Sequence, residues 1–335
     1  MPVLVTGAAG FIGYHLAAAL LARGDRVIGI DCLDPYYDVG LKEGRLALLA
    51  RHPEFALLRA DIAERATWDD VVARHPDIDA VVHLAAQAGV RYSLENPRAY
   101  VRANVVGHLE VLEAARRLPR LRRLAYASTS SVYGANHSLP YSVADRVDDP
   151  VSLYAATKRA DELMSSVYAH LWGLPLVGLR FFTVYGPWGR PDMAYYSFAR
   201  AIVEGRPIRL FRGGTLLRDF TFVDDVVAGV LAAIDRPIPF GEGRPHRLYN
   251  LGNSRPEPVT RLVAVLERSL GRQAIVETAP MQPGDVEATA ADIDDSTRDL
   301  GFVPRVPLED GIPRFVEWFR AYEGIPPPPS VLIDS

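Results

Sequence analysis

The segment that most constrains the fold is 3–13, VLVTGAAGFIG, where a short aliphatic run leads into a glycine-rich turn and then a helix. Gly7 allows the tight turn, Gly10 lets the backbone approach a ligand, and Gly13 lets the helix pack closely on the strand. The free N–H groups and dipole of a helix N-terminus favour an anion such as a pyrophosphate. The segment therefore predicts an α/β fold that opens with a dinucleotide-binding turn.

The first half of the chain alternates short aliphatic runs with amphipathic stretches, which predicts a parallel sheet covered by helices. The expected strands are 3–6, 26–31, 55–59, 80–84, 122–128 and 176–181, and the expected helices include 13–22, 100–117 and 153–171. From about residue 186, Pro, Gly and Arg become more frequent and the elements shorter, which predicts a smaller second region. Segments 223–234 and 248–251 again resemble a helix and a strand of the first layer.

We therefore expect a doubly wound parallel (Rossmann) sheet, α/β in class, with a smaller interleaved domain. The first domain is expected to contain residues 1–180 and about 222–252, and the second about 181–221 and 253–322. Residues 323–335, which include a run of prolines, are expected to form a flexible tail.

Composition excludes several classes of function. The 335 residues are 49% hydrophobic and 23% charged, as in an ordinary globular protein. A net charge of −4 without a long Lys/Arg run argues against a general nucleic-acid partner. No apolar stretch approaches the roughly 20 residues of a membrane span, and the glycine motif begins too early to leave room for a signal peptide. With one cysteine, Cys32, a reducing cytoplasmic location is expected.

The end of the second expected strand favours NAD as the ligand of the glycine turn. Asp31 ends this strand, where a carboxylate can accept both hydroxyls of an adenosine ribose. An NADP enzyme would need a cation there to meet the 2′-phosphate, and neighbouring Cys32 and Leu33 supply none. None of the eight histidines lies in a metal-ligand spacing, so no metal is expected.

Other turns at the carboxyl edge of the sheet are expected around the adenine and ribose. They follow the third and fourth strands, although each alone is equally consistent with an ordinary strand-end turn. The expected cofactor-binding residues are Gly7, Gly10, Phe11, Ile12, Gly13, Asp31, Asp61, Ile62, Leu84, Ala85, Ala86, Gln87, Asn104, Tyr154 and Lys158.

Tyr154 and Lys158 lie one helical turn apart and suggest a catalytic pair. A phenol is ordinarily protonated at neutral pH, but a nearby ammonium and a positively charged nicotinamide ring favour the phenolate. Such a pair is common on helices, and the hydroxyl-rich segment 128–131, STSS, would alone suggest only a turn. Thr129 lies about twenty residues before the pair at a strand end, and this joint arrangement favours catalysis.

Together these residues resemble the extended short-chain dehydrogenase/reductase family, the NAD-dependent epimerases and dehydratases, from Val3 to about Tyr322. Segments 88–93, 180–193 and 282–286 are similar, more specifically, to UDP-glucuronate 4-epimerases. The resemblance implies that Thr129 and Tyr154 are the catalytic hydroxyls and that Lys158 positions the cofactor. It also implies that the first domain binds NAD and the second a nucleotide sugar.

The same resemblance suggests how the sugar nucleotide is held. Arg91, Thr183, Ser130 and Ser131 are candidates for the glucuronate carboxylate, although Arg91 is equally consistent with a surface arginine. Galactose-type epimerases usually have Arg where Gln282 stands, so the diphosphate charge must fall more on another arginine. The expected substrate-binding residues are Arg91, Ser130, Ser131, Thr183, Arg190, Phe211, Arg218, Asn250 and Asp285, with Arg218 and Arg190 assigned to the diphosphate.

The implied reaction is a redox cycle through a transient 4-keto sugar. Dehydratases and decarboxylases of the family carry an acid at the strand end where this chain has Ser130 and Ser131, which leaves 4-epimerisation of UDP-glucuronate to UDP-galacturonate. Two alternatives are a 4-epimerase of neutral UDP-hexoses, such as UDP-glucose, and a non-catalytic nucleotide-sensing protein of the same fold.

Apolar stripes on the two longest expected helices predict a homodimer. Family resemblance suggests that they pair across a twofold axis as a four-helix bundle, although part of each stripe must face its own sheet. The stripe residues are Val101, Val105, Leu109 and Leu112 on the first helix and Leu163, Met164, Val167 and Leu171 on the second.

Overall fold

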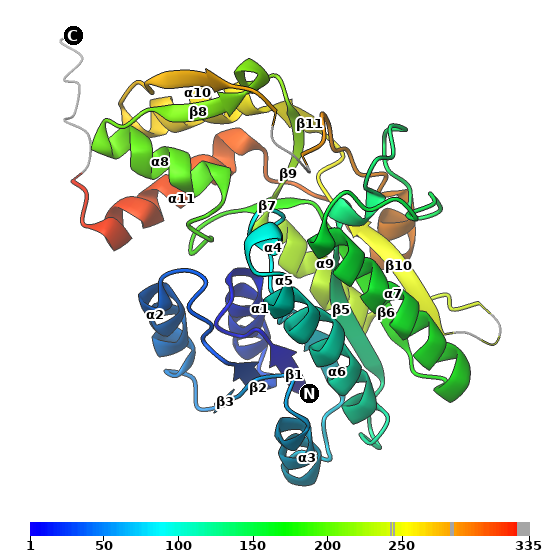
Figure 1. Cartoon of the computed structure of the whole chain (residues 1–335). Coiled ribbons are helices and arrows are strands. Elements are labelled where there is room, and N and C mark those ends of the chain that lie inside the picture. The colour runs from blue at the N-terminus through cyan, green and yellow to red at the C-terminus, as the bar shows by residue number, and fades with distance from the viewer. Residues whose placement is uncertain (242, 244, 282–284, 327–335) are drawn as a thin grey trace.

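The expected parallel sheet is present in the structure, a computed structural model that describes residues 1–241, 243, 245–281 and 285–326 (Figure 1). Seven strands lie in the order β10-β6-β5-β4-β1-β2-β3, and each neighbouring pair is parallel. They are β1 (Pro2–Thr6), β2 (Arg26–Asp31), β3 (Phe55–Arg59), β4 (Ala80–His83), β5 (Arg123–Thr129), β6 (Leu176–Phe181) and β10 (His246–Leu251). The strand order reverses between β1 and β4, which is where doubly wound sheets bind their ligands.

Helices cover both faces of this sheet because side chains alternate along each strand. Val3 and Val5 of β1 pack in one core, and Leu4 packs in the other. The first core contains side chains of α1 (Phe11–Ala22), α2 (Val39–Leu49) and α9 (Val223–Asp235). The second contains side chains of α3 (Arg65–Arg74), α6 (Gly107–Ala115) and α7 (Leu153–Trp172). The doubly wound fold predicted from the sequence is therefore confirmed.

The helix expected at 100–117 differs in its bounds and regularity. It begins earlier with α5 (Pro97–Tyr100), where the Asn96 side chain accepts a hydrogen bond from the backbone N–H of Ala99. A π-helical stretch, η1 (Val101–Val106), connects α5 to α6, and the short α4 (Tyr92–Glu95) precedes them.

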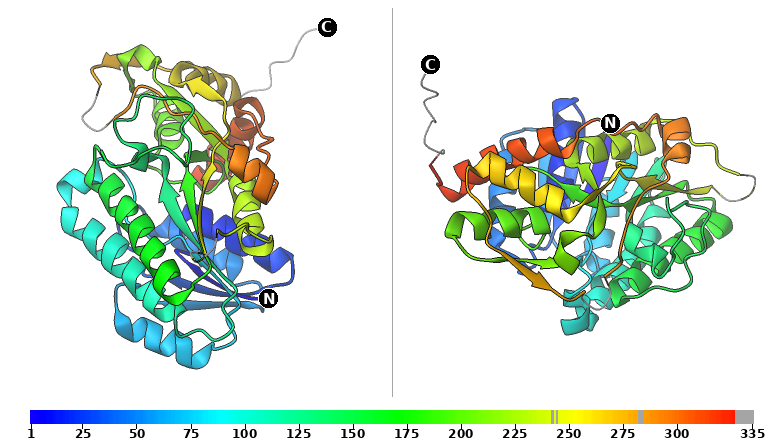
Figure 2. Two further views of the ribbon diagram at one scale, coloured as in Figure 1. Left: turned by 90° about the vertical axis from the view of Figure 1, so that its right-hand side faces the viewer. Right: turned by 90° about the horizontal axis from the view of Figure 1, so that it is seen from above.

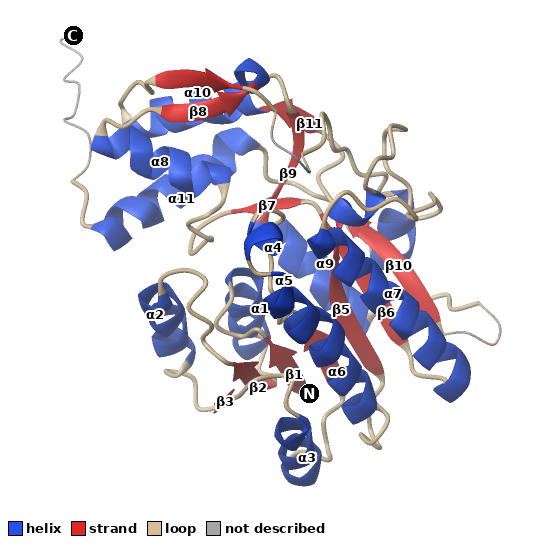
Figure 3. Cartoon of the chain, viewed as in Figure 1, coloured by secondary structure: helices blue, strands red, loops and turns tan. Residues whose placement is uncertain are grey.

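The smaller region lies over the end of the main sheet (Figures 1 and 3). Its strands form a three-stranded sheet, β11-β9-β7, and a two-stranded sheet, β12-β8. Its elements are β7 (Thr183–Tyr185), α8 (Ala194–Glu204), β8 (Ile208–Phe211), β9 (Leu217–Phe222), β11 (Pro256–Pro258), α10 (Val259–Leu270), β12 (Val276–Ala279) and α11 (Leu308–Glu323). Short helical turns lie at η2 (Ser130–Tyr133), η3 (Arg212–Gly214) and η4 (Ser296–Leu300). Between β9 and β11 the chain returns to the first layer for α9 and β10, as the sequence predicts.

The C-terminal helix extends into the segment expected to be a tail. Helix α11 ends at Glu323, whose carboxylate accepts a hydrogen bond from the Tyr196 hydroxyl at 2.8 Å. Residues 327–335 and Gln282 lie outside the described residues. Within the described part of the chain, no helix is long and apolar enough to cross a membrane.

Candidate active site

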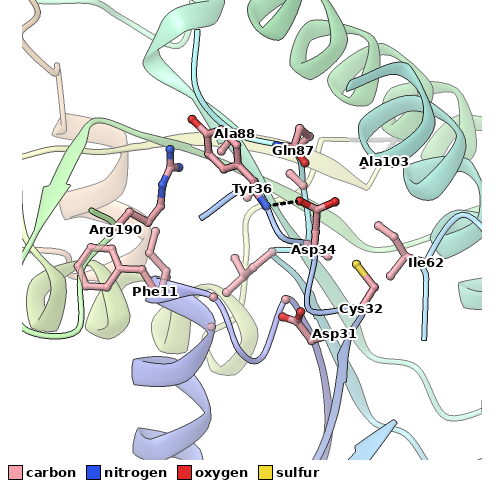
Figure 4. Close-up of a pocket in the computed structure, with 18 of the residues that line it drawn as sticks. Phe11, Asp31, Cys32, Asp34, Tyr36, Ile62, Gln87, Ala88, Ala103 and Arg190 are labelled. Atoms are coloured by element: carbon pink, nitrogen blue, oxygen red, sulfur yellow. Dashed lines mark hydrogen bonds between the residues drawn. The ribbon is translucent and has the colours of Figure 1, made fainter. Parts of the chain in front are cut away.

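A cavity of about 360 Å³ lies at the carboxyl edge of the main sheet (Figure 4). Its walls come from the ends of strands β1 to β6, from the β2–α2 loop, and from the segment 181–193 of the second region. Figure 4 shows Phe11 and Arg190 on one side of this space and Ile62 on the other. The predicted site residues that line it are Gly7, Gly10, Phe11, Ile12, Gly13, Asp31, Asp61, Ile62, Leu84, Ala85, Ala86, Gln87, Thr129, Tyr154, Lys158 and Arg190.

The glycine turn has the shape that a dinucleotide pyrophosphate requires. Gly7 has a φ of 72°, and its N–H donates to the Ile30 carbonyl at 2.7 Å. A Cβ on Gly7 would lie 2.8 Å from the Ala85 nitrogen, and one on Gly13 would lie 2.0 Å from the Gly7 oxygen. Any side chain at either position would therefore disrupt the turn, and the residues present fit NAD.

Asp31 holds the glycine turn and also faces the cavity. Its carboxylate accepts hydrogen bonds from the backbone N–H of Ala9 at 2.9 Å and of Leu33 at 2.8 Å. Each carboxylate oxygen keeps a second lone pair, so both can still accept ribose hydroxyls.

Lys42 is a cation of this region that was not identified from the sequence, where only the neighbours of Asp31 were considered. Helix α2 brings Lys42 into the lining of the cavity, where its ammonium donates to the Asp34 carbonyl at 2.6 Å. The ammonium also lies 4.5 Å from the centre of the Tyr37 ring. A backbone carbonyl and an aromatic ring thus already hold this charge.

We expect Asp31→Asn to lower the preference for NAD over NADP by about tenfold, because the variant no longer repels a 2′-phosphate. Affinity for both cofactors should fall, since an amide nitrogen cannot accept one of the two backbone N–H bonds. The dissociation constants of both cofactors, measured on parent and variant, give the ratio of NADP to NAD dissociation constants for each protein, and this ratio tests the role of Asp31. An unchanged ratio would show that Asp31 supports only the turn.

Asn104 lies behind the cavity and does not line it, which corrects its assignment as a direct cofactor ligand. Its side-chain oxygen accepts from the Gln87 N–H at 2.8 Å, and its amide donates to the Gln87 carbonyl at 3.1 Å and to Thr157 Oγ1 at 3.0 Å. Asn104 therefore ties the turn after β4 to α7 and positions residues that do line the cavity.

The three predicted catalytic residues line the same cavity. Ser152 caps the N-terminus of α7, where its Oγ accepts from the Ala155 N–H at 3.1 Å. This start places Tyr154 in the first turn of the helix and Lys158 in the next. Thr129 is the last residue of β5, and its hydroxyl lies 3.3 Å from Ser131 Oγ. A partly exposed phenol, a buried ammonium and a strand-end hydroxyl thus converge beside the glycine turn.

Four predicted substrate residues meet as two pairs outside the cavity lining. The Arg91 guanidinium lies 5.2 Å from the centre of the Phe211 ring, and the Arg218 guanidinium lies 3.4 Å from Asp285 Oδ1. Burial lowers the pKa of Arg218, and the Asp285 carboxylate opposes that shift.

The candidates for the carboxylate lie at the ends of β5 and β6. Ser130 and Ser131 begin the helical turn after β5. Thr183 begins β7, directly after Phe181 and Phe182, which line the cavity. All three residues are partly exposed.

Asn250 does not fit its predicted substrate role. It is 1% exposed, and its side-chain oxygen accepts from the Tyr133 hydroxyl at 2.7 Å. Its amide donates to the carbonyls of Tyr141 and Asp292 at 2.8 and 2.9 Å. These partners use both amide hydrogens and one acceptor site of a buried side chain, so the role of Asn250 is structural. Sequence reasoning failed here because a buried, fully bonded amide and a ligand-binding amide look the same in a sequence.

Arg190 lines the cavity, but its guanidinium already forms an ion pair within the protein. Its guanidinium pairs with Asp192 at 2.5 Å, and Asp192 also accepts from the Tyr36 hydroxyl at 3.2 Å. These contacts join the segment 186–193 to the β2–α2 loop, and they leave Arg218 as the less committed candidate for the diphosphate.

Arg45 was not identified from the sequence, although it connects the two halves of the site. It is fully buried, and one guanidinium nitrogen donates to the Ala9 carbonyl at 2.7 Å and to the Tyr37 hydroxyl at 2.8 Å. The other guanidinium nitrogens donate to the carbonyls of Trp188 and Gly189. Arg45 thereby joins the glycine turn to the segment 186–193.

Other lining residues missed from the sequence surround the adenosine end and the base of the cavity. They have no motif of their own, because they come in small groups from separate helices, strand ends and loops. They are Cys32, Asp34, Tyr36, Tyr37, Lys42, Ala60, Ala88, Ala99, Arg102, Ala103, Ala127, Ser128, Phe181, Phe182, Val184 and Met193. In the described residues, no group of three or more His, Cys, Asp or Glu side chains is arranged to hold a metal ion.

The glycine turn, the strand-end carboxylate and the Thr–Tyr–Lys set on a doubly wound sheet define an NAD-dependent enzyme of the short-chain dehydrogenase type. The chain belongs to the NAD dependent epimerase/dehydratase family, whose model matches residues 3–252.

Within this family, the chain is similar to several UDP-sugar 4-epimerases. The chain is 46% identical to a probable UDP-glucuronate 4-epimerase of Rhizobium meliloti, over 95% of this chain and 97% of the relative. It is similar to the crystal structure of UDP-glucuronic acid 4-epimerase from Bacillus cereus in complex with UDP-glucuronic acid and NAD, with a TM-score of 0.86, 34% identity, and coverage of 96% and 100%. A UDP-glucose 4-epimerase of Thermotoga maritima also has a TM-score of 0.86, with 28% identity and the same coverage.

Proposed function

We propose that this protein is a UDP-glucuronate 4-epimerase that uses bound NAD to interconvert UDP-glucuronate and UDP-galacturonate. The observation that carries the proposal is the presence of Thr129, Tyr154 and Lys158 in one cavity with the glycine turn. The similarity to UDP-glucuronate 4-epimerases over nearly the whole chain supports the choice of substrate. The region of about 181–221 and 253–322 holds the nucleotide sugar, while the main sheet with α9 and β10 holds NAD.

NAD, when bound, accepts a hydride from C4 of the sugar and later returns it to the opposite face. Tyr154 removes the proton from the 4-hydroxyl as C4 is oxidised, and it returns that proton when C4 is reduced. Thr129 shares a hydrogen bond with the same oxygen, and Lys158 favours the tyrosine phenolate and holds the nicotinamide ribose. The keto sugar must rotate about its link to the diphosphate between the two steps, so its anchor on Arg218 must tolerate rotation.

The carboxylates that line the cavity support epimerisation over dehydration or decarboxylation. Asp31, Asp34 and Asp61 lie at or after the ends of β2 and β3, on the adenosine side. Within the described residues, no acid lines the cavity next to Thr129, where Ser130 and Ser131 follow instead. A group able to protonate a leaving hydroxyl is therefore missing from that side of the described site.

Incubating the protein with UDP-glucuronate and NAD, followed by NMR of the sugar, tests the function. We expect UDP-galacturonate as the main product and at most traces of a UDP-pentose, because hydroxyls of Ser131 and Thr183 hold the carboxylate while C4 is a ketone. Mainly UDP-xylose would overturn the proposal. Turnover of UDP-glucose alone would favour the neutral-sugar alternative, and no turnover of either sugar would favour a nucleotide sensor.

The protein is further proposed to be a homodimer formed through α6 and α7, which lie side by side (Figure 2, left). Leu163, Val167 and Leu171 of α7 are 53%, 52% and 58% exposed, and Val106 and Leu109 are exposed beside them. Leu112, predicted to belong to this face, is fully buried in the second core, while Val105 and Met164 are partly buried. An apolar stripe of this kind on two adjacent helices is typical of a bundle interface with a second copy.

We expect a dimeric mass by light scattering at micromolar concentration and a monomeric mass for Val167→Glu, since a charge would have to be buried at the centre of the interface. Ile275→Glu is the matched control, because Ile275 is 55% exposed and lies in the second region. A monomeric parent protein, or dissociation of both variants alike, would count against this interface.

A further inference from the structure

Behind the catalytic lysine lies a buried carboxylate that the reaction scheme above does not use. Lys158 Nζ donates to Asp161 Oδ2 at 2.6 Å, and the two side chains are 2% and 0% exposed. The pair lies on consecutive turns of α7, so the helix fixes its geometry. Asp161 Oδ1 is also buried and has no hydrogen-bond partner among the described residues. A carboxylate in this position is costly unless its charge interacts with the ammonium beside it.

The groups packed around this pair leave Lys158 as the cation that balances Asp161. On α7 itself, Glu162 is occupied by Arg180 at 2.8 and 2.9 Å and by Arg159. From β4 and α6, His83 and His108 face the pair.

Both histidines are uncharged at neutral pH. Burial, together with the charge of Lys158, lowers the pKa of His83 to about 3, and burial lowers that of His108 well below its usual range. From β5, Tyr126 stays protonated because burial raises the pKa of its hydroxyl. The nearby groups on β4, β5 and α6 therefore add no further charge.

We propose that Asp161 is a positioning residue that holds the Lys158 ammonium at the base of the cavity and partly offsets its charge at Tyr154 and at the nicotinamide. This inference rests on the proposed oxidoreductive function of the site. An ammonium has three donors, so one can remain on Asp161 while the others reach a ribose hydroxyl and the phenol side. Asp161 thus sets how strongly Lys158 favours the Tyr154 phenolate without itself touching substrate.

Asp161 is ionised at the pH where this matters. Burial raises the pKa of Asp161 to about 6, with Lys158 opposing that rise. Near neutral pH the pair therefore carries no net charge. The oxidised nicotinamide ring is positively charged. The neutral Lys158–Asp161 pair therefore repels this ring less than an unpaired Lys158 ammonium would.

The variant Asp161→Asn keeps the shape and an acceptor for Lys158 but removes the negative charge. The uncompensated ammonium should make loss of the Tyr154 proton easier, which moves the acid limb of the kcat profile to lower pH. We expect this limb to shift by about one pH unit.

Asp225→Asn is the matched control for a purely structural loss. Asp225 is 9% exposed and accepts from the backbone N–H groups of Arg305 and Val306 at 3.0 Å, and it lies on α9 outside the cavity lining. This control should lose stability while the acid limb stays in place. A profile of Asp161→Asn that coincides with the parent profile would overturn the proposal.

A second measurement does not depend on turnover. Competition of oxidised against reduced cofactor, followed by fluorescence of the reduced nicotinamide, should show Asp161→Asn favouring the reduced form by about tenfold more than the parent protein. This ratio can be measured whichever sugar the enzyme uses, so it separates failure of this inference from failure of the proposed substrate. If Asp161→Asn does not fold, Asp161→Ser is measured in the same way. An unchanged ratio would overturn the inference.

Discussion

Replacing Tyr154 with Phe is expected to lower the turnover of UDP-glucuronate by about 10³-fold or more, because the variant lacks the group that takes the 4-hydroxyl proton. The substitution removes one oxygen from a partly exposed side chain, so binding of NAD and of the sugar nucleotide should change little. The kcat value and the dissociation constant for UDP-glucuronate, measured on the same preparation, separate the two effects.

Tyr100→Phe provides a matched control for loss of a phenolic hydroxyl near the site. The Tyr100 ring meets the Tyr154 ring edge-on at 6.1 Å, but its hydroxyl donates to the backbone carbonyls of Ala88 and Gly89. Losing these bonds should affect the turn after β4 and produce a far smaller loss of kcat than Tyr154→Phe. Comparable losses in both variants, or near-parent turnover in Tyr154→Phe, would remove the Tyr154 proton transfer from the mechanism.

The parts of the site that could be predicted are those set by local sequence. The glycine turn is one, because Gly7 and Gly13 are required by backbone conformation and by distances within a few residues. Asp31 is another, because a residue that ends a parallel strand must lie at the same edge as the glycine turn. Strand positions were predictable for the same reason: β1, β4 and β5 differ from expectation by one residue at their ends, and β10 begins two residues earlier than expected.

The parts that could not be predicted depend on contacts between distant segments. Asn250 and Asn104 are both amides, and only the fold shows that their partners are backbone groups elsewhere in the chain. Lys42 looks like an exposed residue of an amphipathic helix, yet α2 turns it toward the cavity. The role proposed for Asp161 could not be predicted from the sequence either, because it depends on the burial of its carboxylate beside Lys158.

Arg45 is the most consequential of these residues, because its positive charge is buried and no carboxylate in the described part of the chain pairs with it. Its guanidinium donates hydrogen bonds to the Tyr37 hydroxyl and to the backbone carbonyls of Ala9, Trp188 and Gly189. These partners lie in the glycine turn, the β2–α2 loop and the segment 186–193. A buried guanidinium is stable only when its donors are satisfied, so the arrangement of the three segments depends on this side chain.

We expect Arg45→Met to lower the free energy of unfolding by about 3 kcal/mol or more, since it leaves buried carbonyls without a donor. The variant should also retain less NAD after purification, because the Ala9 carbonyl in the glycine turn loses its anchor and the segment 186–193 loses its link to the Rossmann domain. Denaturant unfolding gives the first quantity, and the cofactor content of the purified protein gives the second.

Arg45→Lys distinguishes charge from geometry. It keeps the positive charge but cannot reach both the Ala9 carbonyl and the Trp188 carbonyl as the planar guanidinium does. We therefore expect Arg45→Lys to retain part of the stability and to lose NAD nearly as readily as Arg45→Met. Arg51→Met, at an exposed position just after α2, controls for removal of an arginine without loss of buried contacts. If all three variants kept parent levels of NAD, Arg45 would be only a packing residue, and the cofactor site would not depend on its link to the second region.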